Sequence, residues 1–176
     1  MQHKMYYNLS TLSQMDIYLF KQGSYTKMYE KFGAHPMTHK GKKGVHFAVW
    51  APNAKSVCVR GDFNDYKIDA HPLQLRSDDS GIWEGFIEDI AIGLTYKYHI
   101  VSLFHNIVHE KSDPFAFYSE VAPKSASRIY ELDNYKWNDK KWMEKRYKNN
   151  ACDSPISVYE MHVGSWRRNP LEDNRY

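Results

Sequence analysis

The chain has 176 residues, a net charge of +3, two cysteines and an aromatic content of 15%. This charge is too small to indicate a nucleic-acid-binding protein, because the basic residues are interspersed with acidic ones. No apolar run is long enough to cross a membrane, and the first ten residues lack the apolar core of a signal peptide. These two observations lead us to expect no nucleic-acid or membrane partner. Because Cys58 is expected in a strand and Cys152 in a linker, we also expect reduced thiols and a cytoplasmic location.

The N-terminal region contains helix signals. Residues 1–11 show no periodicity and are expected to be loose. Ser13 can cap a helix over Gln14–Gln22, which Gly23 would end, and Ile17 and Phe20 would form its buried stripe. A second short turn is expected over Thr26–Phe32. Both elements are predicted to pack against a larger domain.

The stretch over Gly44–Tyr66 has the two-residue period of paired strands. Its first part places Val45, Phe47 and Val49 on one face, and its second part repeats the pattern at Val57 and Val59. The intervening Ala51–Ala54 segment contains a proline and an asparagine, which favour a turn. The polar and aromatic segment Phe63–Tyr66 then projects as a loop from the end of the second strand.

Further short strands are expected at intervals of about ten residues. Their expected ranges are Ile82–Ile87, Leu94–Val101, Asn106–His109 and Arg128–Leu132. This spacing, with turn signals between the strands, predicts an all-β, immunoglobulin-like β-sandwich. Its core would contain four inward side chains, namely Phe47, Val57, Trp83 and Tyr98, and Lys97 would then point outward.

The C-terminal part has a different composition. Residues 135–148 are polar and favour a helical turn, and residues 149–154 have the composition of a linker. The run over Ile156–Val163 is almost continuously apolar, which is typical of a strand buried on both faces.

Several segments resemble the N-terminal carbohydrate-binding module of family 48 (isoamylase N-terminal type) of 1,4-α-glucan branching enzymes. The central ones are FAVWAPNAKSV and GDFNDY, and the others are YEKFGAHP, HPL, GIWEGFI, YKYHI, KSDPFAF and ISVYEMHVGSWRR. The resemblance extends from about Tyr18 to the last residue. Within it, YEKFGAHP together with VYEMHVGSWRR is specific to branching enzymes.

The resemblance implies four segments. These are a helical segment over 1–36, the β-sandwich module over 37–133, a clasp and linker over 134–154, and a truncated start of the catalytic (β/α)8 barrel over 155–176. Branching enzymes transfer α-1,4-glucan segments to α-1,6 branch points in glycogen biosynthesis, and the retaining mechanism needs two carboxyl groups about 5–5.5 Å apart. In a barrel these groups come from later strands. The chain by itself is therefore expected to lack the catalytic residues and to be inactive without the missing barrel.

The residues themselves indicate neither catalysis nor a metal. Asp62, Asp65, Asp78 and Asp113 all occur in turn contexts, where a short carboxylate supports the backbone. The nine histidines lack cysteine or carboxylate partners at ligand spacing, so we expect no metal or cofactor.

The resemblance also implies a glycan-binding site. The positions that match it are Asn64, Tyr66 and Lys97, and the expected ligand is an α-1,4-glucan such as glycogen or a maltooligosaccharide. This chain departs from the pattern in two respects. Tyr66 replaces the usual tryptophan, and no second aromatic platform occurs near His109–Ser112. A module that only supports the barrel is therefore an equal alternative.

Two further interpretations are open. The first is a stand-alone glycan-binding regulatory module, although such a module has no use for the barrel strand in VYEMHVGSWRR. The second is the N-terminal module of a related debranching or trehalose-releasing hydrolase. The segment Gly164-Ser165-Trp166 and the GAHP element favour a branching enzyme instead.

Overall fold

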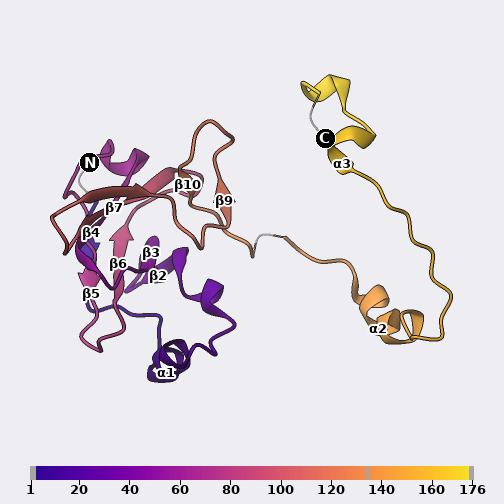
Figure 1. Ribbon diagram of the computed structural model, residues 1–176, viewed down its shortest axis with the longest axis horizontal. Helices are drawn as coiled ribbons and strands as arrows, with labels where there is room; N and C mark the ends of the chain where they lie inside the picture. Colours follow the sequence, from indigo (N-terminus) through magenta and orange to yellow (C-terminus); the bar gives the residue numbers. More distant parts are fainter. Residues whose placement is uncertain (1–2, 134, 175–176) are drawn as a thin grey trace. The chain divides into compact units, whose positions relative to one another are not determined.

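The computed structural model describes residues 3–133 and 135–174, and the chain divides into two compact units, residues 1–134 and 135–176. The first unit contains two antiparallel sheets (Figure 1). One sheet has the order β1 (Met5–Tyr6), β6 (Ile82–Glu88), β3 (Lys42–Trp50) and β2 (Gly33–His39), and β5 (Gln74–Leu75) also pairs with β6. The other has the order β4 (Ala54–Gly61), β7 (Thr95–Ser102), β10 (Ser127–Arg128) and β9 (Tyr118–Ser119), and β8 (Val108–Lys111) also pairs with β7.

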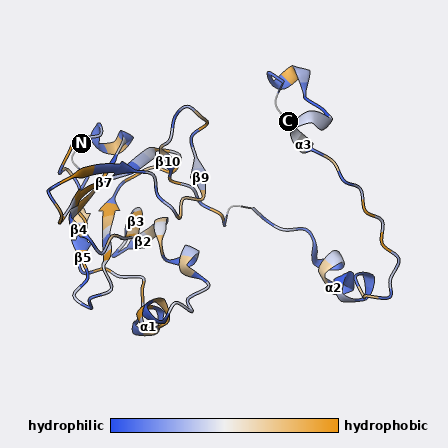
Figure 2. Cartoon of the chain, viewed as in Figure 1, coloured by the Kyte–Doolittle hydropathy of each residue, from blue (hydrophilic) through white to orange (hydrophobic). Residues whose placement is uncertain are grey.

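The main core lies where the inward faces of these strands meet. The four side chains predicted to face it, Phe47, Val57, Trp83 and Tyr98, all belong to one buried cluster. Figure 2 shows apolar residues along the strands of this unit. The all-β sandwich predicted from the alternation is therefore confirmed.

The N-terminal helix α1 (Gln14–Gln22) has the predicted bounds. Ser13 and Asp16 form a reciprocal capping box, and Gly23 ends the helix in the left-handed conformation at φ 75°. Ile17 is buried in a second apolar cluster with Phe32 and Ile82, against which Phe20 also packs. Between α1 and β2, the 3₁₀ turn η1 spans Met28–Glu30. The helix thus packs near the Ile82 end of β6, on the face that points away from the main core.

Two strands near the N-terminus correct the sequence analysis. Residues 1–11 were expected to be loose, but β1 pairs with β6 through Met5 opposite Ile87. The segment ending at residue 36 was expected to be helical, but β2 begins at Gly33 and pairs along its whole length with β3. Pro36 was compatible with this strand because β2 is at the edge of its sheet, where a missing N–H costs no ladder hydrogen bond.

Two predicted strands are shifted or shortened. The strand expected over Asn106–His109 is β8, which begins two residues later. The strand expected over Arg128–Leu132 is the two-residue β10, although Ile129 still donates its N–H to the Leu94 carbonyl.

The second unit contains α2 (Lys140–Asn149), α3 (Val163–Trp166) and the 3₁₀ turn η3 (Pro170–Glu172). The prediction of a buried strand over Ile156–Val163 is wrong, because residues 155–162 have no regular structure. Ile156 and Val158 are 82% and 81% exposed. A strand needs neighbours to satisfy its N–H and C=O groups, and the described residues provide none for this segment.

Candidate glycan-binding surface

The turn that follows β4 is held by Asn64. This turn, η2 (Asp62–Asn64), begins beside Gly61, where an added Cβ would lie 2.2 Å from the Thr95 carbonyl oxygen, so only glycine fits. The Asn64 side chain accepts from the Gly61 N–H at 2.9 Å and donates to the Val59 carbonyl at 3.0 Å. Its amide nitrogen also lies 2.8 Å from His71 Nδ1. Asn64 is buried and its polar atoms already have partners within the protein.

Tyr66 follows this turn in an uncommon backbone conformation. Asp65 and Tyr66 have φ values of 51° and 54°, the left-handed region that non-glycine residues seldom adopt. The Tyr66 hydroxyl lies 2.6 Å from Thr95 Oγ1, which anchors the far end of the ring, and the ring remains partly exposed. This partial burial raises the pKa of the Tyr66 phenol, so the hydroxyl stays protonated at neutral pH.

Lys97 points outward from β7, as the alternation predicted, since Tyr96 and Tyr98 on the opposite face are fully buried. Its Nζ donates to Ser125 Oγ at 2.9 Å. Lys97 and Tyr66 line the same depression of about 480 Å³, whose remaining residues are Arg60, Glu110, Glu120, Pro123, Lys124, Ser125 and Ala126. The structure therefore brings Tyr66 and Lys97 together. Asn64, in contrast, is buried and lines a different cavity together with His71.

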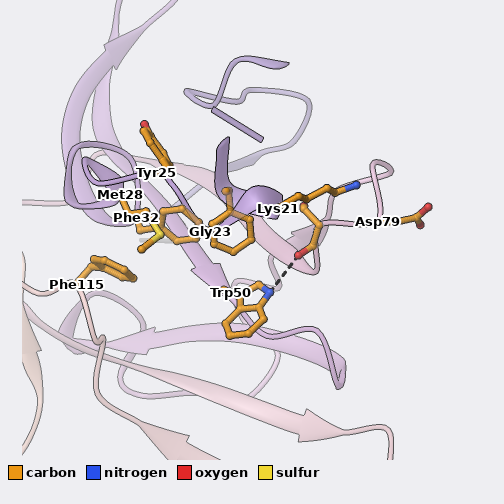
Figure 3. A pocket seen from close by; sticks show the side chains of 10 residues that line it. Lys21, Gly23, Tyr25, Met28, Phe32, Trp50, Asp79 and Phe115 are labelled. Atoms are coloured by element: carbon orange, nitrogen blue, oxygen red, sulfur yellow. Dashed lines mark hydrogen bonds between the residues drawn. The ribbon is translucent and has the colours of Figure 1, made fainter. Parts of the chain in front are cut away.

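A larger and more apolar cleft of about 600 Å³ was missed by the sequence analysis. Figure 3 shows Trp50 in this cleft, with Phe115 on one side and Lys21 and Asp79 on the other. Trp50 is 55% exposed, and its indole donates from Nε1 to the Ser80 carbonyl at 3.1 Å (Figure 3). The alternation of β3 did indicate that Trp50 points away from the main core, because Trp50 lies on the face of β3 opposite to Phe47. The sequence did not show that α1 would form a wall beside it.

Three of the four aspartates considered in the sequence analysis support the backbone, whereas Asp65 forms an exposed ion pair with Lys67 at 3.6 Å. Asp62 accepts from the Thr95 N–H at 2.7 Å, and Asp78 accepts from the Ser80 N–H at 3.2 Å. The buried Asp113 accepts from the hydroxyls of Tyr96 and Tyr98 and from the Phe115 N–H. Burial nevertheless raises the pKa of Asp113 above its ordinary value.

Within residues 3–133 and 135–174, no group of three or more histidine, cysteine, aspartate or glutamate side chains is placed to hold a metal ion. In the same part of the chain, no helix combines the length and apolar character that a membrane crossing requires.

An aromatic ring beside hydrogen-bonding side chains on an open face of an antiparallel sandwich suits a ligand that has both apolar faces and hydroxyl groups, such as a sugar. Comparison with known proteins identifies the family. Residues 31–116 match the family described as carbohydrate-binding module 48 (isoamylase N-terminal domain), and the chain belongs to this family through that domain.

Curated proteins similar to this chain include branching enzymes. The chain is 48% identical over 167 residues to the 1,4-alpha-glucan branching enzyme GlgB of Aquifex aeolicus, covering 95% of this chain and 26% of the relative. It is 45% identical over 167 residues to the corresponding enzyme of Gloeobacter violaceus, covering 95% of this chain and 23% of the relative. The chain thus spans about a quarter of the length of these relatives, and it matches their N-terminal region.

A solved structure of an alpha amylase candidate from Salmonella typhimurium has the same fold. It aligns with a TM-score of 0.54 and 20% identity over 77% of this chain and 20% of that chain. At this identity the likeness supports the fold alone.

Proposed function

We propose that this chain is the N-terminal part of a 1,4-α-glucan branching enzyme and that its sandwich binds linear α-1,4-glucans. In this proposal, residues 155–176 belong to the start of the catalytic barrel of the longer enzyme. The identity of 45–48% to branching enzymes supports this interpretation over a regulatory module or the module of a related hydrolase. The transferase activity in glycogen biosynthesis would belong to the whole enzyme.

The observation that carries the binding proposal is the position of Tyr66 beside Lys97. The tyrosine ring offers a rigid apolar face, which suits the apolar face of a glucose ring, and the ammonium group donates hydrogen bonds to hydroxyls. Asn64 acts at this site by holding the loop, since its polar atoms are already used within the protein. We therefore assign Tyr66 and Lys97 to direct contact and Asn64 to positioning.

We expect maltoheptaose to bind this surface with a dissociation constant of about 1 mM, or about −4 kcal/mol, because only one aromatic platform is present. Titration of the isotopically labelled chain, followed by NMR, should shift the signals of Tyr66 and Lys97. In Tyr66→Ala, addition of maltoheptaose should no longer shift the Lys97 signal. Tyr130→Ala is the matched control, because Tyr130 is an exposed tyrosine outside the depression. If tens of millimolar glucan cause no shift anywhere, the module serves as a scaffold.

The Trp50 cleft is a second candidate surface for the same class of ligand. The specific observation is that the indole N–H is held by the Ser80 carbonyl while the ring stays largely exposed. In the same titration, shifts at Trp50 that survive in Tyr66→Ala would assign binding to this cleft. Shifts that are lost in Trp50→Ala but kept in Tyr66→Ala would place the main glucan-binding site in the Trp50 cleft.

The chain alone is expected to show no branching activity. Asp62 accepts from the Thr95 N–H, and Asp113 accepts from the Tyr96 hydroxyl and the Phe115 N–H, so these carboxylates serve structural contacts. A retaining mechanism needs two carboxyl groups about 5–5.5 Å apart, which the branching-enzyme resemblance assigns to later strands of the barrel. Incubation with amylose, read by iodine absorbance and by linkage analysis, should give no new α-1,6 linkages. The appearance of such linkages with the purified chain would show that it contains a catalytic site.

A further inference from the structure

We infer that Arg60 is a positioning residue for the Tyr66 platform. Arg60 holds the backbone of the Tyr66 loop, and Glu110 and His99 hold Arg60 in place. This inference rests on the proposed function of the Tyr66 and Lys97 surface. Arg60 lies on β4 directly opposite Lys97 on β7, and it lines the same depression. Its role is to hold the backbone of the loop, with no contact to glucan required.

The loop needs such a support because of its backbone. Two consecutive non-glycine residues, Asp65 and Tyr66, have positive φ, a conformation that the Cβ atom disfavours. The Arg60 Nε donates to the Tyr66 carbonyl at the second of these residues. Two backbone bonds, from Tyr66 N–H to the Gly61 carbonyl and from Lys67 N–H to the Asn64 carbonyl, close the turn at 3.0 Å each. Arg60 thus ties the strained part of the loop to the rigid β4 strand.

The guanidinium group is itself held in place from the other side. Its Nη1 donates to Glu110 Oε1, and His99 Nδ1 lies 2.6 Å from the same oxygen. Glu110 lies opposite His99 in the β7–β8 pairing, so both partners are fixed by the sheet. The side chains of Arg60 and His99 are 19% and 7% exposed, whereas that of Glu110 is 37% exposed, so water reaches this network only from the Glu110 side.

This arrangement also explains how two cations coexist across neighbouring strands. Arg60 and Lys97 are directly opposite, and like charges in that position repel each other. The Glu110 carboxylate is bound by Arg60, while Lys97 donates to Ser125, so the two cations have separate partners. An arginine fits this role because its planar fork can donate to the Tyr66 carbonyl and the Glu110 carboxylate at once, which a single ammonium group does less well.

The test compares Arg60→Met and Arg60→Lys with Lys55→Met. Lys55 is a matched control, because it is a cation on the same strand that donates to Asn106, away from the Tyr66 loop. Hydrogen exchange at the Tyr66 and Lys67 amides, measured without glucan, reports the loop directly. Maltoheptaose titration of the same variants reports binding.

For Arg60→Met we expect exchange at these two amides to become about tenfold faster and the dissociation constant to rise about tenfold. The melting temperature should change by no more than in Lys55→Met. Arg60→Lys should resemble Arg60→Met, because it keeps the charge but not the fork. Full retention of loop protection and affinity in Arg60→Lys would show that charge alone is sufficient and would overturn the inference.

Two other outcomes separate the inference from the proposed function. Unchanged exchange in Arg60→Met overturns the positioning role, whatever the affinity. Faster exchange with unchanged affinity would show that loop order does not control binding, and would also overturn it. If the unmodified chain binds no glucan, the proposed function fails, and the exchange result still decides whether Arg60 holds the loop.

Discussion

Replacing Trp83 by alanine is expected to lower the free energy of unfolding of the sandwich by about 3–5 kcal/mol. Trp83 lies on β6 in the main core and is only 7% exposed. Its indole donates from Nε1 to the Ala51 carbonyl at 3.0 Å, in the turn between β3 and β4. The substitution therefore leaves a large cavity and removes one of the two hydrogen bonds that the Ala51 carbonyl accepts, the other coming from the Ala54 N–H at 3.1 Å. Both changes destabilise a folded domain.

Thermal unfolding followed by circular dichroism measures this effect. The midpoint should fall by on the order of 10–20 °C, given a few degrees for each kcal/mol in a domain of this size. Trp137→Ala is the matched control, because Trp137 is 77% exposed in the second unit, where truncation should cost less than about 0.5 kcal/mol. A midpoint unchanged by Trp83→Ala would show that the assigned face of β6 is wrong.

Acidification is expected to destabilise the chain through His46, by up to about 3 kcal/mol. His46 is fully buried on β3, and this burial lowers its pKa to about 4. Its Nε2 lies 3.2 Å from the Leu9 carbonyl, while Nδ1 has no hydrogen-bond partner among the described residues. Because the folded pKa lies below the ordinary value near 6.5, the stability contributed by neutral His46 is complete above pH 6.5. It is lost as the pH falls from there to about 4.

A nearby carboxylate does not reverse this expectation. Glu84 Oε2 lies 3.7 Å from His46 Nε2, a distance that would suit an ion pair. However, Glu84 is already paired with Arg76 at 2.7 Å and accepts from Ser10 at 2.9 Å. Its charge is therefore largely compensated, and burial of the imidazole dominates. We expect His46 to be neutral at pH 7.

Urea unfolding at pH 7 and pH 4.5 tests this expectation. His46→Phe should reduce the loss of stability between the two pH values, whereas His105→Gln, at an exposed loop histidine, should leave it unchanged. Part of the loss should remain in His46→Phe, because burial also lowers the pKa of His71. NMR titration of the His46 ring should give a pKa near 4, and a value near 6.5 would contradict the assignment.

Local patterns in the sequence were sufficient to predict most of the sandwich. Alternation assigned Phe47, Trp83 and Tyr98 to the core, because successive side chains of a strand must point to opposite faces. Ser13 and Gly23 marked the bounds of α1, because capping depends on residues within one turn. The family resemblance, which no periodicity could supply, indicated the glycan-binding class.

Features that depend on partners distant in the sequence were decided only by the tertiary structure. Sequence spacing did not indicate that the Asn64 amide would be hydrogen-bonded to Val59 and His71. It also did not indicate that β2 would pair with β3. Alternation placed Trp50 on the outer face of β3, but the cleft beside it forms between α1, the segment that follows α1, and Phe115, which only the tertiary structure brings together. Conversely, the apolar run over residues 156–163 had the composition of a buried strand but forms none. Composition sets what a segment can bury, whereas hydrogen-bonded neighbours decide whether it becomes a strand.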